Sequence, residues 1–204
     1  MSLARLLQLA SPALPVGAYS YSQGLEAAVE AGIVHDAASA ECWIGDVLEL
    51  SIGRLDAPLL WRMLQGEDLN ELFLATRETA ELRAECVQMG FSLARLLPEF
   101  GVTEASVEEP SFQHVFAQVA REWRLDAREV LIAYLWSWLE NQVMAAIKTV
   151  PLGQTAGQRM LLSLGERLEA IASEARSGEW SNLAPGLAML SSRHETQYSR
   201  LFRS

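Results

Sequence analysis

The run 130-VLIAYLWSWL-139 is the most apolar stretch of the chain, and the fold prediction starts from it. A run of ten residues is too short to cross a bilayer, and polar residues from Glu140 onward end it. An apolar run of this length is instead typical of a helix inside a protein. We therefore expect these residues to lie in a core, and we expect no membrane as a partner.

Capping residues set the expected limits of this helix. Asp126 is followed three positions later by Glu129, an Asp variant of the capping box that marks a helix N-terminus. At the other end, Pro151 cannot continue a helix. The pattern predicts one helix over residues 127–149, and a helix that is apolar on all sides belongs at the centre of a domain.

Helical periodicity covers most of the remaining chain, whereas strand-like alternation never lasts more than a few residues. Asp56 is the expected N-cap of one helix and Gly32 the expected C-cap of another. Residues 99–110 have the character of an acidic surface connection. The expected helices cover residues 2–11, 22–34, 36–50, 56–64, 69–97, 111–123, 127–149, 153–176 and 184–197.

These elements predict an all-α fold: a single compact domain of about nine helices around a central hydrophobic helix. The sequence shows no internal repeat and no linker that would divide it into domains. We assign residues 1–193 to the helical domain and residues 194–204 to a C-terminal partner-binding tail.

The chain is acidic, with a formal net charge of −10, and the negative charge lies in its first half. Residues 1–110 carry 17 acidic and 6 basic side chains, whereas residues 111–204 carry 9 and 10. A field of this sign repels nucleic acids and anionic membranes. We therefore expect no nucleic-acid role and favour a basic protein as partner.

The cysteines indicate a reducing compartment. Cys42 and Cys86 are too few and too isolated for a disulfide scaffold, and no secretory signal opens the chain. We expect a cytoplasmic protein with two reduced thiols, both packed among apolar helix positions.

Motifs for catalysis, cofactors and metals are missing from the sequence. There is no C-x-x-C, H-E-x-x-H or G-x-S-x-G pattern. The segment 153-GQTAGQR-159 lacks the Lys-Ser/Thr pair of a phosphate loop and follows a helix instead of a strand. The three histidines are far apart in sequence, so a metal site is left as an alternative only: His35, His114 and His194.

Two internal segments have features that a core does not require. In 11-SPALPVGAYSYSQGLE-26, prolines and Gly17 make a rigid loop that presents Tyr19 and Tyr21, either to an interface or inward. In 145-AAIKTVPLGQTAGQ-158, Lys148 stands at a helix end before a Pro-Leu-Gly corner, which is either purely architectural or a presented surface. Gln154 and Gln158 are four residues apart and are expected to share one helix face.

The tail 194-HETQYSRLFRS-204 is the third such segment. Tyr198, Leu201 and Phe202 have an i, i+3, i+4 spacing, with Arg200 and Arg203 beside them. Such a segment is either a last helical turn packed on its own domain or a surface for a partner. Apolar rings beside arginines are typical of interface hot spots, which favours the partner.

The chain resembles the UreF family of urease accessory proteins. The resemblance is carried by four segments and covers nearly the whole chain: 7-LQLASPALPVGAYSYSQGLE-26, 77-RETAELRAECVQMG-90, 138-WLENQVMAAIKTVPLGQTAGQ-158 and 191-SSRHETQYSRLFRS-204. It implies an all-helical, non-enzymatic assembly factor that forms homodimers. Its implied partners are UreD (UreH), the GTPase UreG and apo-urease, into which nickel is inserted.

The resemblance also implies where these partners bind. The tail, with Tyr198, Arg200, Leu201 and Phe202, would contact UreD, with Arg203 beside it. The corner would face UreG, and the loop with Tyr19 the dimer axis. The corner residues in question are Lys148, Pro151, Leu152, Gln154 and Gln158.

The middle motif departs from the family. Where the family commonly has R-x-S-x-Q-M-G, this chain has 83-RAECVQMG-90, so no role of a serine there is transferred. Two other functions stay open at this point. One is a metallochaperone that carries nickel on its own histidines, and the other is a small helical enzyme that works from the VPLGQ corner.

Overall fold

The computed structural model describes residues 2–103 and 107–204, and within these residues it contains helices and no strand. The α-helices are α1 Ser2–Leu9, α2 Leu25–Glu30, α3 Ala37–Val47, α4 Ala57–Leu64, α5 Asn70–Ala75, α6 Ala80–Ala94, α7 Phe112–Glu122, α8 Ala127–Thr149, α9 Gln154–Gly165, α10 Leu168–Ala175 and α11 Pro185–His194. A 3-10 turn, η1 (Ala18–Ser20), and a π-helical segment, η2 (Leu48–Asp56), complete the set. The predicted all-α fold in one compact domain is confirmed.

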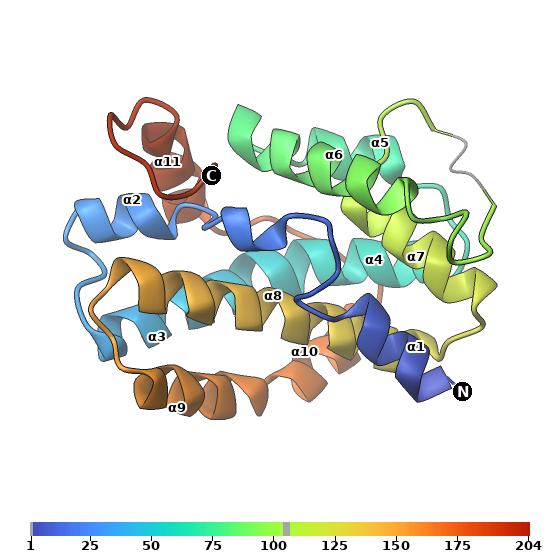
Figure 1. The fold of residues 1–204 in the computed structure, drawn as a ribbon, viewed down its shortest axis with the longest axis horizontal. Helices are drawn as coiled ribbons and strands as arrows, with labels where there is room; N and C mark the ends of the chain where they lie inside the picture. Colours follow the sequence, from blue (N-terminus) through green and yellow to red (C-terminus); the bar gives the residue numbers. More distant parts are fainter. Residues whose placement is uncertain (1, 104–106) are drawn as a thin grey trace.

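Helix α8 lies at the centre of the domain, as predicted (Figure 1). It packs against α1, α2, α3, α4, α7, α9 and α10. Asp126 caps its N-terminus by accepting bonds from the backbone amides of Arg128 and Glu129, each at 3.0 Å. Among the described residues, α8 is also the one helix long and apolar enough to cross a membrane, a test that a buried core helix passes as well.

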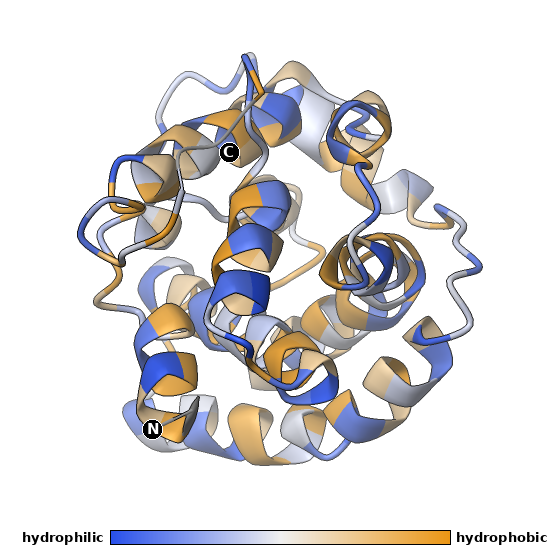
Figure 2. Ribbon diagram, turned by 90° about the vertical axis from the view of Figure 1, so that its right-hand side faces the viewer, coloured by the Kyte–Doolittle hydropathy of each residue, from blue (hydrophilic) through white to orange (hydrophobic). Residues whose placement is uncertain are grey.

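The surrounding helices are amphipathic. Figure 2 shows hydrophobic and hydrophilic residues side by side on these helices, as expected when one face is buried and the other solvated. The buried apolar side chains form a single cluster that extends from Leu6 in α1 to Phe202 near the end of the chain. One continuous core therefore includes the last residues.

The prediction that Asp56 begins a helix is wrong. Helix α3, the π-helical segment η2 and α4 follow one another without a break, and Val47, Asp56 and Ala57 all have right-handed helical dihedral angles. The Asp56 side chain caps nothing. It is buried and pairs with Arg77, because a carboxylate inside a core needs an opposite charge.

Two stretches that the periodicity treats as continuous each contain a break. The stretch 69–97 divides after Ala75, and α6 restarts with Thr79 as N-cap, whose side chain accepts a bond from the Leu82 amide at 3.2 Å. The single helix expected over 153–176 is wrong, because α9 ends at Gly165 and α10 begins at Leu168. The second break lets both α9 and α10 pack against α8.

Other local predictions have mixed outcomes. Gly32 has a φ of 71°, the left-handed conformation expected of a C-cap glycine after α2. Cys86 is buried as expected, but the prediction of core packing is wrong for Cys42, which is exposed on α3. Of the predicted acidic connection 99–110, residues 104–106 lie outside the described part of the chain.

Gly90 permits the close packing of α6 against the segment that enters α7. A Cβ atom at this position would lie 1.9 Å from the backbone oxygen of Pro110 and 2.8 Å from the Ser111 carbonyl carbon. These atoms belong to the backbone and cannot rotate away. The α6–α7 packing therefore requires a residue without a side chain at position 90.

We predict that Gly90→Ala destabilises the domain by about 3 kcal/mol, because the added methyl forces α6 and α7 apart. The free energy of unfolding in urea measures this. Gly186→Ala in α11 is the matched control, since nothing lies within 4 Å of a Cβ placed there. Equal stabilities of the two variants would contradict the close-packing argument.

Candidate functional site

The tail, residues 194–204, lies on its own domain beside the loop that precedes α2. The backbone oxygen of Ser204 accepts bonds from the Ser22 amide at 2.7 Å and from the Ser22 hydroxyl at 2.6 Å. The Arg203 amide donates to the Ser20 carbonyl at 2.8 Å. Figure 1 shows the C-terminus between α11 and α6. Segments from opposite ends of the chain therefore meet here.

Glu26 of α2 holds the backbone of the tail. Its carboxylate accepts bonds from the amides of Leu201 at 2.8 Å and Phe202 at 2.9 Å, and the residue is buried. Hydrogen bonds to a charged acceptor are about twice as strong as neutral ones. One buried carboxylate on the body thus fixes two consecutive residues of the tail.

His194 lies fully buried between two carboxylates. Its Nδ1 is 2.8 Å from Glu81 of α6, and its Nε2 is 3.4 Å from Glu26. The second oxygen of Glu81 accepts a bond from the Arg200 guanidinium at 2.8 Å. The end of α11, the tail, α2 and α6 are therefore joined by one cluster of charged groups.

The beginning of the tail also caps α6. The Glu195 carboxylate accepts a bond from the Ala80 amide at 2.9 Å, a favourable place for a negative charge because the N-terminus of a helix is partly positive. Beside it, the hydroxyls of Thr79 and Ser191 are 2.8 Å apart. The tail is thus fixed at both of its ends.

The aromatic and apolar residues of the tail divide between the inside and the outside. After His194 the tail is not helical, so the i, i+3, i+4 spacing creates no common face. Phe202 is buried, and the Lys148 ammonium lies 5.7 Å from its ring centroid. Tyr198 and Leu201 are 105% and 74% exposed. The seated tail therefore presents Tyr198 and Leu201, and it covers Phe202.

The two loop tyrosines divide in the same way. Tyr19 in η1 is 69% exposed, whereas Tyr21 is buried and donates a bond to Gln88 of α6 at 2.8 Å. Burial raises the pKa of Tyr21, and the nearby Glu85 adds to this effect. Of the two, Tyr19 is the one available to another molecule.

The corner residues form a second exposed surface. Lys148 is exposed in the last turn of α8, and Gln154 and Gln158 are both exposed on α9, consistent with the shared face that their spacing predicts. Pro151 is exposed and Leu152 is half-buried. Lys148 belongs to both regions, because it also reaches the tail at Phe202.

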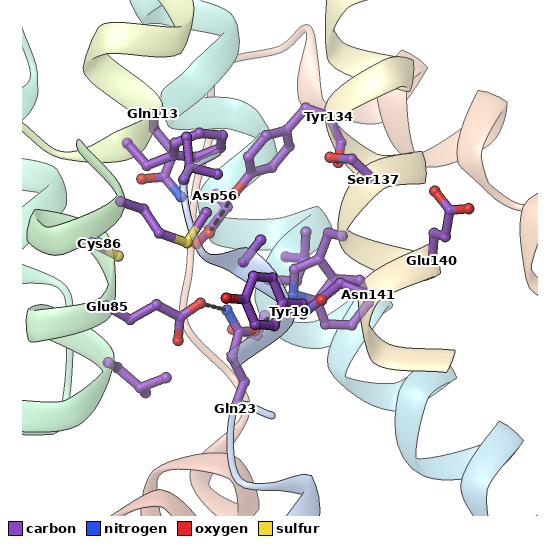
Figure 3. Close-up of a pocket in the computed structure, with 18 of the residues that line it drawn as sticks. Tyr19, Gln23, Asp56, Glu85, Cys86, Gln113, Tyr134, Ser137, Glu140 and Asn141 are labelled. Atoms are coloured by element: carbon purple, nitrogen blue, oxygen red, sulfur yellow. Dashed lines mark hydrogen bonds between the residues drawn. The ribbon is translucent and has the colours of Figure 1, made fainter. Parts of the chain in front are cut away.

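The loop before α2 borders a cavity of about 320 Å³ with a polar network in its wall (Figure 3). Arg77 donates to Asp56 at 2.8 Å, Tyr134 donates to the other Asp56 oxygen at 3.1 Å, and Gln113 donates to the Tyr134 hydroxyl at 2.9 Å. Burial raises the pKa of Tyr134, and the charge of Asp56 raises it further. Burial alone would lower the pKa of the Arg77 guanidinium. The negative charge of Asp56 outweighs this effect and holds the pKa above its usual range.

A second network in the cavity wall is centred on Gln23, which has a φ of 51°. Its amide oxygen accepts a bond from the Trp138 indole at 2.7 Å, and its amide nitrogen donates to Glu85 at 2.7 Å. A left-handed conformation is uncommon for a residue other than glycine. Here it is held because the side chain bridges α8 and α6.

The motif around Cys86 offers no nucleophile. Burial raises the pKa of the Cys86 thiol to about 12, and a thiol that stays protonated is a poor nucleophile. The departure of this chain from the family at this motif therefore places no reactive group there.

The three histidines have separate surroundings. His35 is exposed beside the Gly32 carbonyl, and burial lowers the pKa of His114, which lies 3.9 Å from Asp68. His194 lies in the tail cluster described above. Within residues 2–103 and 107–204, no group of three or more His, Cys, Asp or Glu side chains is arranged to hold a metal ion.

Glu26, Glu81, Glu85 and Gln23 were missed as site residues in the sequence. The 4-residue spacing of Glu81 and Glu85 could have indicated that both carboxylates lie on one face of α6. That this face meets the tail is decided by tertiary packing alone.

Comparisons with known proteins identify relatives over the whole chain. The sequence model of the UreF family matches residues 34–165. A urease accessory protein UreF from Azoarcus sp. (strain BH72) is 56% identical, and the match covers 100% of this chain and 96% of that protein. The corresponding protein from Dechloromonas aromatica (strain RCB) is 50% identical, with 100% and 98% covered.

A further relative is a fusion. The bifunctional urease accessory protein UreEF of Bordetella bronchiseptica is 48% identical to this chain. The match covers 99% of this chain and 52% of that protein.

We predict that Asp56→Asn destabilises the domain by about 3–5 kcal/mol, because it leaves the buried Arg77 charge without a partner. Urea denaturation followed by tryptophan fluorescence measures this. The matched control is Glu67→Gln, which breaks the solvated Arg62–Glu67 pair and should leave the midpoint nearly unchanged. A midpoint for Asp56→Asn equal to that of the control would contradict the role of the ion pair.

Proposed function

Because the chain belongs to the UreF family of urease accessory proteins, we propose that it is a non-enzymatic assembly factor. In this proposal it works with UreD (UreH) to recruit and regulate the GTPase UreG during nickel insertion into apo-urease. It acts in the cytoplasm as a homodimer, and neither nucleic acid nor a membrane is a partner. The observation that carries the proposal is the seated tail with its two exposed anchors.

The tail is proposed as the UreD-binding surface. Tyr198 and Leu201 are exposed, yet the backbone beside them is held by Glu26. A fixed backbone lowers the entropy cost of binding, and a tyrosine is a frequent hot spot of interfaces. Arg200 and Arg203 would orient the partner. Phe202, the third predicted anchor, holds the tail on its own domain in this conformation, so its contact with a partner requires the tail to move.

The corner is proposed as the UreG-facing surface. Its exposed residues include a lysine on an otherwise acidic chain, and Lys148 is the only lysine in the sequence. A positive charge at an exposed surface can set the orientation of an acidic partner. The proposed contacts are Lys148, Pro151, Leu152, Gln154 and Gln158. Tyr19, 69% exposed on its rigid loop, is proposed to lie at the dimer axis.

The fusion relative supports a role beside other accessory proteins. In the Bordetella protein, one chain carries both a UreF-like part and a further part, as its name UreEF states. Covalent linkage raises the effective concentration of one module near the other. We infer that this chain also acts within an assembly of accessory proteins.

We predict that the double variant Tyr198→Ala/Leu201→Ala binds UreD at least about tenfold more weakly, because truncation of hot-spot side chains commonly costs more than 1 kcal/mol each. Titration calorimetry with purified UreD measures the affinity. Leu162→Ala, which removes a 73% exposed leucine on α9, is the matched control. Undiminished capture of UreD by the double variant would disprove the tail assignment.

For the corner, we predict that Lys148→Ala weakens UreG recruitment several-fold with little change in thermal stability. A lysine at a helix C-terminus contributes only a few tenths of a kcal/mol, and its contact with Phe202 is worth about 0.5–1 kcal/mol. Co-purification of UreG with the UreD complex and a melting curve measure the two effects. Arg95→Ala, an exposed cation after α6, is the control. Parallel losses of stability and binding would count against a specific UreG contact.

A further inference from the structure

Glu85 of α6 contacts the cavity and the tail at the same time. Its Oε1 accepts the bond from Gln23 on the cavity side (Figure 3), and its Oε2 faces the Ser204 hydroxyl at 2.9 Å. The residue is 6% exposed. The tail thus forms part of the cover that separates this carboxyl group from solvent, and a charge on Glu85 acts directly on the seated tail.

We propose that Glu85 controls the seating of the tail: the tail lies on the domain while the Glu85 carboxyl is protonated, and it is released when the carboxyl ionises. The proposal concerns the isolated chain and does not depend on any partner.

The surroundings of Glu85 favour its neutral form. Burial raises the pKa of this carboxyl to about 7, and the bonds from Gln23 and Ser204 offset only part of the rise. The positive charge of Arg77 would stabilise an ionised Glu85, but Arg77 is already paired with Asp56. The negative charge of Asp56 repels a negative charge on Glu85. The remaining titratable or charged groups that face this region are Cys86 of α6, Tyr21 of the loop, and Arg203 of the tail beside Tyr21.

The direction of the pH effect follows from the surroundings of Glu85 in the seated state and in the released state. In the released state water reaches Glu85 from the side that Ser204 covers, so its pKa falls toward the ordinary 4.5. Because the pKa is higher in the seated state, protonation stabilises the seated tail, fully below pH 4.5 and progressively less as the pH rises through about 7. The two pKa values predict a roughly tenfold rise in the equilibrium constant for release between about pH 6 and pH 8.

Release would uncover groups that the seated tail hides. The Phe202 ring leaves the core, and the Leu201 and Phe202 amides leave Glu26. The same step lets water reach Glu85 from the side that Ser204 covers. The seated tail presents Tyr198 and Leu201. The released tail also exposes Phe202, and it is free to move.

Hydrogen–deuterium exchange of the full chain tests this. We expect protection of the peptide that contains Leu201 and Phe202, corrected for the intrinsic exchange rate, to fall about tenfold from pH 6 to pH 8, with a midpoint near 7. Glu85→Gln cannot ionise but keeps hydrogen-bonding groups for Gln23 and Ser204, so its tail should show equal protection at both pH values. Glu99→Gln, an exposed glutamate after α6, should retain the tenfold change.

Two results would overturn the proposal. One is a wild-type tail whose protection does not change between these pH values. The other is a Glu85→Gln chain that keeps the tenfold change, which would assign the effect to another group. Peptides of α8 serve as the internal reference for global stability. If Glu85→Gln does not fold, the wild-type profile decides alone: a tail midpoint near 7 with unchanged α8 protection supports the proposal, and any other profile rejects it.

Discussion

The removal of α8 from water is the constraint on which the rest of this structure depends. Leu131, Leu135, Leu139 and Val143 are fully buried along this 23-residue helix, so other elements must cover it on several sides. Short amphipathic helices meet this requirement, because each needs only one apolar face. The break after Gly165 follows from the same requirement, because α9 and α10 both pack against α8.

Covering one helix from several sides also buries polar groups, and these decide the character of the cavity. Asp56 and Arg77 neutralise each other, and Tyr134 and Gln113 extend their hydrogen bonds. Such pairing is what makes a buried charge tolerable. Within residues 2–103 and 107–204, Glu85 forms no salt bridge, and its hydrogen-bond partners are an amide and a hydroxyl. This difference separates a structural ion pair from a group that can change its charge near neutral pH.

The tail combines two requirements that act against each other. The proposed binding of a partner requires apolar side chains in solvent, whereas a defined conformation requires the tail to be held on the domain. The non-helical backbone after His194 resolves this by turning Phe202 inward and leaving Tyr198 and Leu201 outside. Glu26 binds the tail through the backbone amides of Leu201 and Phe202. The side chains of Tyr198 and Leu201 are therefore free to contact another molecule.

By itself the sequence determined the helical class, the central helix with its Asp126 cap, and the shared face of Gln154 and Gln158, because these depend on local spacing and on the period of the helix. It also identified the family through four motifs. Only the tertiary structure decided that Asp56 is an ion-pair partner instead of a cap, that Tyr19 faces out while Tyr21 faces in, and that Glu26, Glu81 and Glu85 meet the tail. The contacts of the three glutamates with the tail join residues more than 100 positions apart, and no local pattern encodes which distant surface a side chain will meet.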